Sequence, residues 1–267
     1  MSEAPLLVAG RTAFVTGGAG RLGSVIAATL QREGALVVVS DCDGERLAQI
    51  GKRLSASGRA HCVQGDIAQS EDVERMMEEA ERIAGPLDIL VNAHGIIPQR
   101  AFLDMTAAEW DRPFEVNVRG TMLSCQTFAR RLISRGTRGA IVNVSSSASR
   151  APRPGRMHYA ASKAAVNMLT EALAVELGPH GIRVNAVVPA LTLDQVYDGM
   201  SPDNPPYVNF VIQGTPLGRT GSPIDVAETV VFLASERSAW TTGAIVDVTG
   251  GAHCARRANA PVGAASR

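Results

Sequence analysis

Short apolar runs rich in β-branched residues alternate with longer amphipathic stretches along almost the whole chain. Several of the short runs are nearly continuous in Val, Ile and Leu, which is typical of strands covered by helices on both faces. They predict strands over Thr12–Thr16, Leu36–Ser40, Ala60–Gln64, Ile89–Asn92, Ala140–Val144, Arg183–Val188 and Ala244–Val248. The amphipathic stretches predict helices over residues 22–33, 44–56, 70–84, 106–135, 157–178 and 223–235.

This alternation predicts right-handed βαβ units, and therefore an α/β fold: a doubly wound parallel sheet of about seven strands with helices on both faces. The length of 267 residues suits a single domain over residues 1–267, with its core over about 11–251. Residues 254–267 are rich in Ala and Arg, and we expect this tail to be flexible.

Residues 190–222 interrupt the alternation with several prolines and glycines, so we expect a long irregular loop there. It follows the sixth predicted strand and leaves the carboxyl edge of the sheet, where open α/β folds bind their ligands. Long loops in compact domains are usually functional, and we interpret this one as a substrate lid.

The composition excludes several classes of protein. Lys plus Arg equals Asp plus Glu, 26 each, which gives no sign of a nucleic-acid or membrane-surface partner. The four cysteines are widely spaced, so we expect neither a disulfide framework nor a zinc site. Residues 1–10 lack the pattern of a secretory signal, and no apolar run approaches the ~20 residues needed to cross a bilayer. We therefore expect a cytoplasmic protein.

Glycines cluster between the first predicted strand and helix, where Gly18, Gly20 and Gly23 form a GxGxxG pattern. Glycine lets the backbone approach a pyrophosphate, and the following helix start offers free N–H groups. Asp41, 18 residues after Gly23, is placed to accept the hydroxyls of an adenosine ribose. Its charge would repel a 2′-phosphate, so NAD is predicted in preference to NADP. Arg21 leaves NADP open, because its side chain could reach the same position.

Tyr159 and Lys163 lie one helical turn apart in a stretch predicted to be helical, so their side chains share a face. An ammonium beside a phenol favours the phenolate and lowers the phenol's pKa, which suits proton transfer. The pair is a candidate for acid–base catalysis, and its position in a chain with a dinucleotide motif strengthens that interpretation.

With these motifs in order, the chain resembles a short-chain dehydrogenase/reductase of the compact, single-domain, Rossmann-type form over about residues 11–251. Thr16, Gly17 and Gly23 match the family's TGxxxGxG motif, although Arg21 occupies the place of its middle glycine. Asp66-Ile67 resembles the pair whose Asp contacts adenine. Asn92-Ala93-His94-Gly95 resembles the NNAG motif, with Ala93 and His94 as departures, and we expect His94 to pack beside the cofactor without a chemical role.

The resemblance also implies a catalytic set. Asn117, in Asn117-Val118-Arg119-Gly120, matches the active-site Asn whose backbone carbonyl holds a water. The family's serine precedes the tyrosine by thirteen residues, which selects Ser146 and leaves Ser145 and Ser147 as alternatives. The YxxxK motif gives Tyr159 and Lys163.

The end of the sixth predicted strand, Val188-Pro189, resembles the segment that contacts the nicotinamide carboxamide. A Thr usually follows that Pro by five residues, but Asp194 occupies the place and Thr192 comes two residues earlier. Either Thr192 or backbone groups take the role. The residues that the resemblance assigns to the cofactor are Gly17, Gly20, Arg21, Leu22, Gly23, Asp41, Asp66, Ile67, Asn92, Gly95, Tyr159, Lys163, Val188, Pro189 and Thr192.

The implied reaction is the NAD(P)-dependent interconversion of a secondary alcohol and a ketone by hydride transfer, with Tyr159 as general acid/base and no metal. Two alternatives are a 3-oxoacyl-thioester reductase of the same family and a non-catalytic, NAD-binding redox sensor. The retained Asn117, Ser146, Tyr159 and Lys163 favour the enzyme.

Arg150, Arg153 and Arg156 lie between Ser146 and Tyr159. Arg156 could bind a carboxylate, sulfonate or phosphate of the substrate together with Ser146 and Tyr159, since guanidinium groups bind such anions bidentately. The alternative is a solvated or interface loop. In the family, the helices corresponding to 106–135 and 157–178 pair with their copies, so the resemblance implies a homotetramer.

Overall fold

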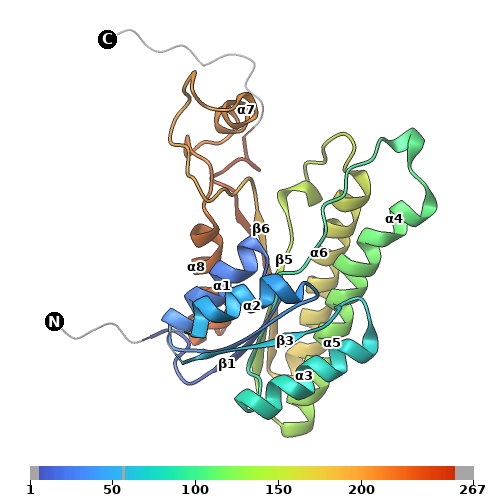
Figure 1. Cartoon of the computed structure of the whole chain (residues 1–267), viewed down its shortest axis with the longest axis vertical. Helices are drawn as coiled ribbons and strands as arrows, with labels where there is room; N and C mark the ends of the chain where they lie inside the picture. The colour runs from blue at the N-terminus through green and yellow to red at the C-terminus, as the bar shows by residue number, and fades with distance from the viewer. Residues whose placement is uncertain (1–5, 56–57, 256–267) are drawn as a thin grey trace, which may run out of the picture.

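The computed structural model describes residues 6–55 and 58–255, and in it seven parallel strands form one sheet in the order β3-β2-β1-β4-β5-β6-β7 (Figure 1). This confirms the doubly wound parallel sheet. The strands are β1 Thr12–Thr16, β2 Leu36–Asp41, β3 Ala60–Gln64, β4 Ile89–Asn92, β5 Gly139–Val144, β6 Ile182–Pro189 and β7 Ile245–Val248.

The central strands are buried from end to end, as their largely apolar sequences predict. Every residue of β1, β4 and β5 is buried. β1 pairs with β2 on one side and with β4 on the other, so the direction of winding reverses there. Such a reversal leaves a crevice at the carboxyl edge of the sheet.

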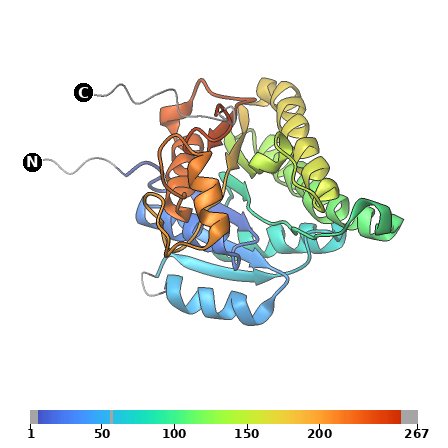
Figure 2. The same ribbon diagram turned by 90° about the horizontal axis from the view of Figure 1, so that it is seen from above.

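The helices cover the sheet in two layers, each with its own apolar core (Figure 2). α1, α2 and α8 pack on one face through residues such as Ile26, Leu47 and Val230, and α3, α5 and α6 pack on the other around Met77 and Phe128. The helices are α1 Arg21–Arg32, α2 Gly44–Leu54, α3 Ser70–Ala84, α4 Ala107–Pro113, α5 Gly120–Arg135, α6 Met157–Leu177, α7 Pro206–Gln213 and α8 Pro223–Ala234.

The prediction of one continuous helix over 106–135 was wrong. α4 and α5 are separated by a π-helical turn, η3 Phe114–Arg119. Pro113 at the end of α4 has no amide proton to continue the i→i−4 hydrogen bonds, which favours a change of helical pitch there. The turn matters for the site because Asn117 lies within it.

The prediction that residues 190–222 are wholly irregular was also wrong, because the segment contains α7. Pro206 suits the first helical position, since the missing amide proton is not needed there, and Val208 and Ile212 bury one face of the helix. Isolated bridges join Thr192 to Gly221 and Asp198 to Arg219 at the base of the segment. Figure 1 shows α7 standing well beyond the end of β6.

Within the described residues, no helix combines the length and the apolar content needed to cross a membrane. The expectation of a flexible tail falls almost entirely on residues 256–267, which lie outside the described part of the chain.

Candidate active site

The residues that the sequence singles out converge on the carboxyl edge of the sheet. Thr16, Asp41, Asn92, Val144 and Pro189 are the last residues of β1, β2, β4, β5 and β6. Because these strands are parallel, their carboxyl ends meet at one edge, and the loops that follow them surround one crevice.

Two positions of the loop after β1 require glycine. Gly17 has a φ of 64°, and a Cβ there would lie 2.5 Å from the Cα of His94. A Cβ at Gly23 would lie 2.1 Å from the carbonyl oxygen of Gly17, so any side chain would force the start of α1 away from the loop. These contacts fix the path of the loop against both β4 and α1.

The start of α1 is suited to an anion. Its N-cap is Gly20, which has no side chain to accept a hydrogen bond from the first turn. Among residues 6–55 and 58–255, the amides of Arg21, Leu22 and Gly23 have no hydrogen-bond acceptor. Three free N–H groups at the positive end of a helix fit the pyrophosphate of a dinucleotide.

Asp41 lies where the adenosine half of such a ligand would be bound. One carboxylate oxygen accepts a hydrogen bond from the Ala19 amide at 3.1 Å, and the other accepts one from the Asp43 amide at 3.1 Å. These bonds hold the negative charge beside the glycine loop. On the next strand along, Asp66 accepts a bond from the Ala68 amide at 2.9 Å, which shapes the turn around Ile67.

Tyr159 lies in the first turn of α6 and is 7% exposed. Burial raises the pKa of its phenol, while a hydrogen bond with the Ser146 side chain and the positive charge of Arg156 act in the opposite direction. In the structure described, burial has the larger effect and the opposing charge is that of Arg156, so a lowering of this pKa by Lys163 stays a prediction.

Ser146 is the serine that acts on the phenol. Its Oγ accepts a hydrogen bond from the Ala148 amide at 3.2 Å, so its hydroxyl proton can be donated to another oxygen. Ser145 is buried and donates to the carbonyl oxygen of Lys163 at 3.1 Å, which directs its hydroxyl away from Tyr159.

The Lys163 ammonium is buried below the phenol, one helical turn further along α6. Its Nζ donates a hydrogen bond to the carbonyl oxygen of Val144, the last residue of β5, at 2.8 Å. Burial lowers the pKa of Lys163 to about 8. A Cβ at Gly95 would lie 3.3 Å from this Nζ, so the glycine leaves room for the ammonium.

Asn117 is fully buried, and its side chain ties the π-helical turn to its surroundings. Its Oδ1 accepts a hydrogen bond from the Ile96 amide at 2.9 Å, and its Nδ2 donates to the Ser162 hydroxyl at 2.9 Å. Its backbone carbonyl accepts a bond from the Thr121 hydroxyl at 2.8 Å.

A buried polar network behind the site was missed by sequence reasoning. Asn92 donates to the Asn143 side chain at 2.9 Å, Asn143 donates to Thr170 at 2.9 Å, and Ser124 donates to Asn92 at 2.7 Å. The Asn92 side chain therefore points into the core. Asn143 was the sequence signal for this network, because it is a lone amide in an apolar strand and a buried polar group needs hydrogen-bond partners.

The three arginines after Ser146 have different surroundings. Arg150 forms an ion pair with Asp247 of β7, and Arg153 is exposed. Arg156 is half-buried at the N-cap of α6, and its charge acts on Tyr159. His158 is fully buried, and within the described residues neither of its ring nitrogens has a hydrogen-bond partner.

Thr192 is buried at the base of segment 190–222, whereas Asp194 is exposed. Thr192 lines a cavity of about 500 Å³ together with Thr215, Asp247 and Thr249. Neither Ser146 nor Tyr159 lines this cavity, so it lies beside the catalytic groups rather than over them.

The comparisons with known proteins agree with this geometry. Residues 18–253 match the family described as enoyl-(acyl carrier protein) reductase. The chain is 39% identical to the (3R)-3-hydroxyacyl-CoA dehydrogenase of Mus musculus, over 90% of this chain and 95% of the relative. It is 34% identical to the L-rhamnose 1-dehydrogenase (NAD(P)(+)) of Sphingomonas sp. (strain SKA58), over 92% of this chain and 97% of the relative.

A similar solved structure is that of a gluconate 5-dehydrogenase from Burkholderia cenocepacia J2315 in complex with NADP and tartrate, with a TM-score of 0.85 and 29% identity. The match covers 94% of this chain and 98% of that one. The chain thus belongs to the short-chain dehydrogenase/reductase family and is an NAD(P)-dependent oxidoreductase that interconverts an alcohol and a ketone.

Proposed function

We propose that Tyr159 is the general acid/base of this reaction. The observation that carries the proposal is the buried phenol of Tyr159, whose pKa the nearby Ser146 side chain lowers, with Lys163 one helical turn away on α6 and its ammonium bonded to the end of β5. Bound NAD supplies the hydride acceptor at C4 of its nicotinamide. Tyr159 as phenolate takes the hydroxyl proton of the alcohol, and as phenol it returns one to the ketone oxygen in reduction.

The neighbouring residues orient the substrate and carry the proton away. With substrate bound, Ser146 would donate its hydroxyl proton to the substrate oxygen, which opposes the charge that develops there. Lys163 binds the nicotinamide ribose and supplies positive charge near Tyr159. The Asn117 carbonyl would hold a water through which the proton leaves.

Replacing Tyr159 by Phe keeps the ring and removes only the ionisable oxygen. We expect turnover to fall by about 10²–10⁴-fold, the usual range for general acid–base groups. The dissociation constant for NAD should stay within about twofold, which is less than the loss of one hydrogen bond would cause. Steady-state kinetics and calorimetric titration with NAD measure the two effects. Retained turnover would contradict the assignment of Tyr159.

The pKa of about 8 for Lys163 has a consequence for stability, since its ordinary value is 10.5. Between these values the unfolded chain binds more protons than the folded one, so the free energy of unfolding rises with pH by up to about 1.4 kcal/mol per unit. Lys163→Met removes this rise, whereas Lys52→Met on the exposed face of α2 keeps it. Urea unfolding of the three proteins between pH 7.5 and 10 measures the difference, and parallel curves would show that Lys163 titrates normally.

We propose NAD as the preferred cofactor, because the carboxylate of Asp41 is held beside the glycine loop by the Ala19 and Asp43 amides. A 2′-phosphate bound there would meet this negative charge. Arg21 is exposed at the start of α1 and is the residue that would permit some use of NADP.

Asp41→Ala should raise the ratio of kcat/KM for NADP to that for NAD by at least about tenfold, since a close charge repulsion of 1.4 kcal/mol or more is removed. Asp43→Ala is the matched control. It removes the same charge two residues away and costs stability through the lost cap of α2, but it should leave the ratio unchanged. Equal ratios in the wild type and Asp41→Ala would remove Asp41 from this role.

We further propose that the substrate carries an anionic group bound by Arg156. This guanidinium is half-buried, lies one turn before Tyr159 and has no ion-pair partner in the described part of the chain. Arg150, in contrast, is paired with Asp247. The similarity to a gluconate 5-dehydrogenase fits this idea, since gluconate carries a carboxylate.

Arg156→Met should raise KM for 3-hydroxybutyrate by about tenfold to a hundredfold, the effect of losing a charged hydrogen bond. KM for the methyl ester should change little. Arg53→Met, at an exposed position of α2, is the control for the loss of one positive charge. Equal effects on the acid and the ester would overturn the role of Arg156. A preference for the 3-hydroxybutyryl-CoA thioester would favour the acyl-thioester alternative.

A non-catalytic redox sensor is a weaker alternative. Such a protein would bind NAD without proton transfer, so it would not require the phenol of Tyr159, the hydroxyl of Ser146 and the ammonium of Lys163 at the carboxyl edge of the sheet. The 3-oxoacyl-thioester reductase alternative is supported by the similarity to the (3R)-3-hydroxyacyl-CoA dehydrogenase. It would use the same Tyr159 and differ in the substrate group that is recognised.

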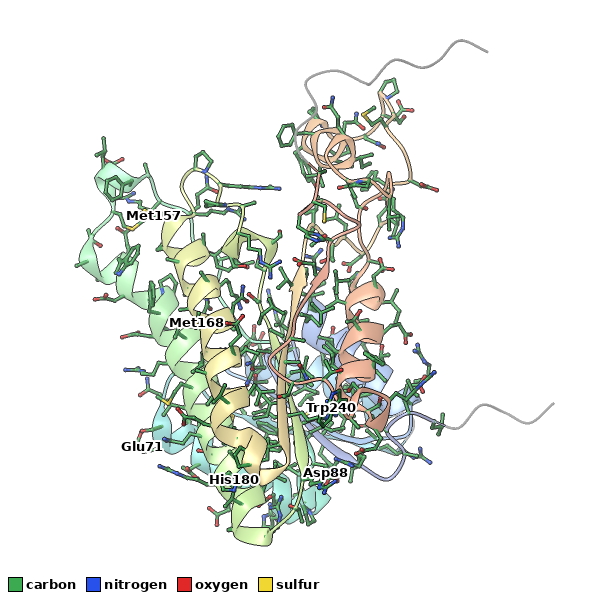
Figure 3. The ribbon with its side chains drawn as sticks, turned by 180° about the vertical axis from the view of Figure 1, so that it is seen from behind. Glu71, Asp88, Met157, Met168, His180 and Trp240 are labelled. Carbon is green, nitrogen blue, oxygen red and sulfur yellow. The ribbon has the colours of Figure 1, made fainter. Side chains whose placement is uncertain are left out.

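We also propose that residues 1–267 form one cytoplasmic domain in which segment 190–222 acts as a lid, and that four copies assemble. Free cysteines at all four positions support a reducing compartment. Apolar side chains on two outer faces support assembly: Met168 and Val175 on α6, and the fully exposed Trp240 beyond α8 (Figure 3). Exposed apolar surface of this kind is typical of subunit interfaces.

A further inference from the structure

His94 follows β4 at a position where the family usually has Ala, and in this chain its imidazole makes contacts on two sides. It is 8% exposed. Its Nδ1 lies 2.7 Å from the hydroxyl of Thr16, the last residue of β1. Its Nε2 lies 3.3 Å from the hydroxyl of Thr121 in the first turn of α5. The ring therefore lies between the cofactor loop and the start of α5, which directly follows the π-helical turn that contains Asn117.

The neighbouring hydroxyls decide where the proton of the ring resides. The Thr121 hydroxyl donates its one proton to the carbonyl oxygen of Asn117 at 2.8 Å, so it accepts at its other side. Nε2 of His94 must then carry the proton, and Nδ1 accepts from Thr16. The result is a directed chain from Thr16 through His94 and Thr121 to the Asn117 carbonyl.

The imidazole remains neutral at working pH. Burial and the nearby Lys163 ammonium lower the pKa of His94 to about 3, while a hydrogen bond from the ring to the backbone carbonyl of Val116 acts more weakly in the opposite direction. A neutral ring can accept at one nitrogen and donate at the other, whereas a protonated ring would donate at both and lose the bond from Thr16.

The backbone around His94 leaves room for its ring and packs closely against it. A Cβ at Gly17 would overlap the His94 backbone, and a Cβ at Gly120 would lie 3.2 Å from Nε2. The Ala93 amide donates to the carbonyl oxygen of Thr16 at 3.1 Å. Movement at His94 would thus reach the glycine loop on one side and the π-helical turn on the other.

We propose that His94 is a positioning residue with two separable roles: Nδ1 holds Thr16 and the adjoining cofactor loop, and Nε2, through Thr121, holds the Asn117 carbonyl. The second role rests on the proposed function of Asn117. The first concerns dinucleotide binding alone and does not depend on turnover.

Two substitutions separate the roles, because the amides of Asn and Gln replace different ring nitrogens. In His94→Asn, the side-chain oxygen can take the place of Nδ1 and accept from Thr16, but the side chain is too short to reach Thr121. In His94→Gln, the terminal amide can donate to Thr121 in place of Nε2, while the bond from Thr16 is lost.

We expect His94→Asn to lower kcat by about fivefold with the NAD dissociation constant unchanged, since one neutral hydrogen bond is lost on the Asn117 side. His94→Gln should raise the NAD dissociation constant by about fivefold and keep kcat, for the same reason on the Thr16 side. Thr121→Val should reproduce His94→Asn, and combining the two should add no further loss. Thr127→Val, which removes a buried hydroxyl from the same helix outside the site, is the matched control.

Calorimetric titration of the full chain with NAD gives the dissociation constants, and kinetics with saturating NAD give kcat. The proposal is overturned if Asn and Gln variants change both quantities equally, change neither, or show the reverse pattern, because the ring would then only fill space. If the wild-type chain turns over no alcohol, the proposed function has failed, but the dissociation constants still decide the role of His94 at Thr16.

Discussion

The hydrogen bond from the Lys163 ammonium to the carbonyl oxygen of Val144 organises the site. A buried charge must have partners, and the terminal carbonyl of a central strand is one that cannot move without the sheet. The bond fixes the rotation of α6 relative to β5, and Tyr159, one turn earlier on the same face, is thereby directed to the edge where Ser146 begins the next loop. The fully buried β5 makes this anchor rigid, so precision at the phenol derives from the packing of the sheet.

The strands could be predicted because their signal is local. Short sequences such as Thr12–Thr16, apolar in the middle and rich in β-branched residues, are typical of strands covered on both faces. The π-helical turn and α7 could not be predicted, because the local sequence gives no comparable signal for either. Around Pro113 the apolar periodicity continues across the break, and at Pro206 the density of prolines conceals a short helix whose buried face depends on distant contacts. Both exceptions lie next to the site.

The site could be predicted in its residues but not in its electrostatics. Spacing identified Tyr159 and Lys163, yet it could not show that burial outweighs neighbouring charge at the phenol. Nor could it show that Arg150 is engaged by Asp247, 97 residues away, while Arg156 is left near the phenol. The contacts of His94 could not be predicted for a related reason: its two partners come from β1 and α5, and no sequence window contains both. Contacts between segments that are far apart in the sequence decide which polar residues take part in the site.

Because the start of α1 has no capping side chain, the stability of this protein depends on its ligand, and its abundance depends on its stability. Ordinary helices begin on a side chain that accepts their first amides, but Gly20 offers none, so three amides of the first turn have no acceptor within the described residues. A ligand that accepts those bonds binds the folded state only, and its binding energy adds to the free energy of folding. A cell depleted of dinucleotide would thus hold a more easily unfolded and more readily degraded enzyme, and the loop that recognises the cofactor would also set how long the protein lasts without it.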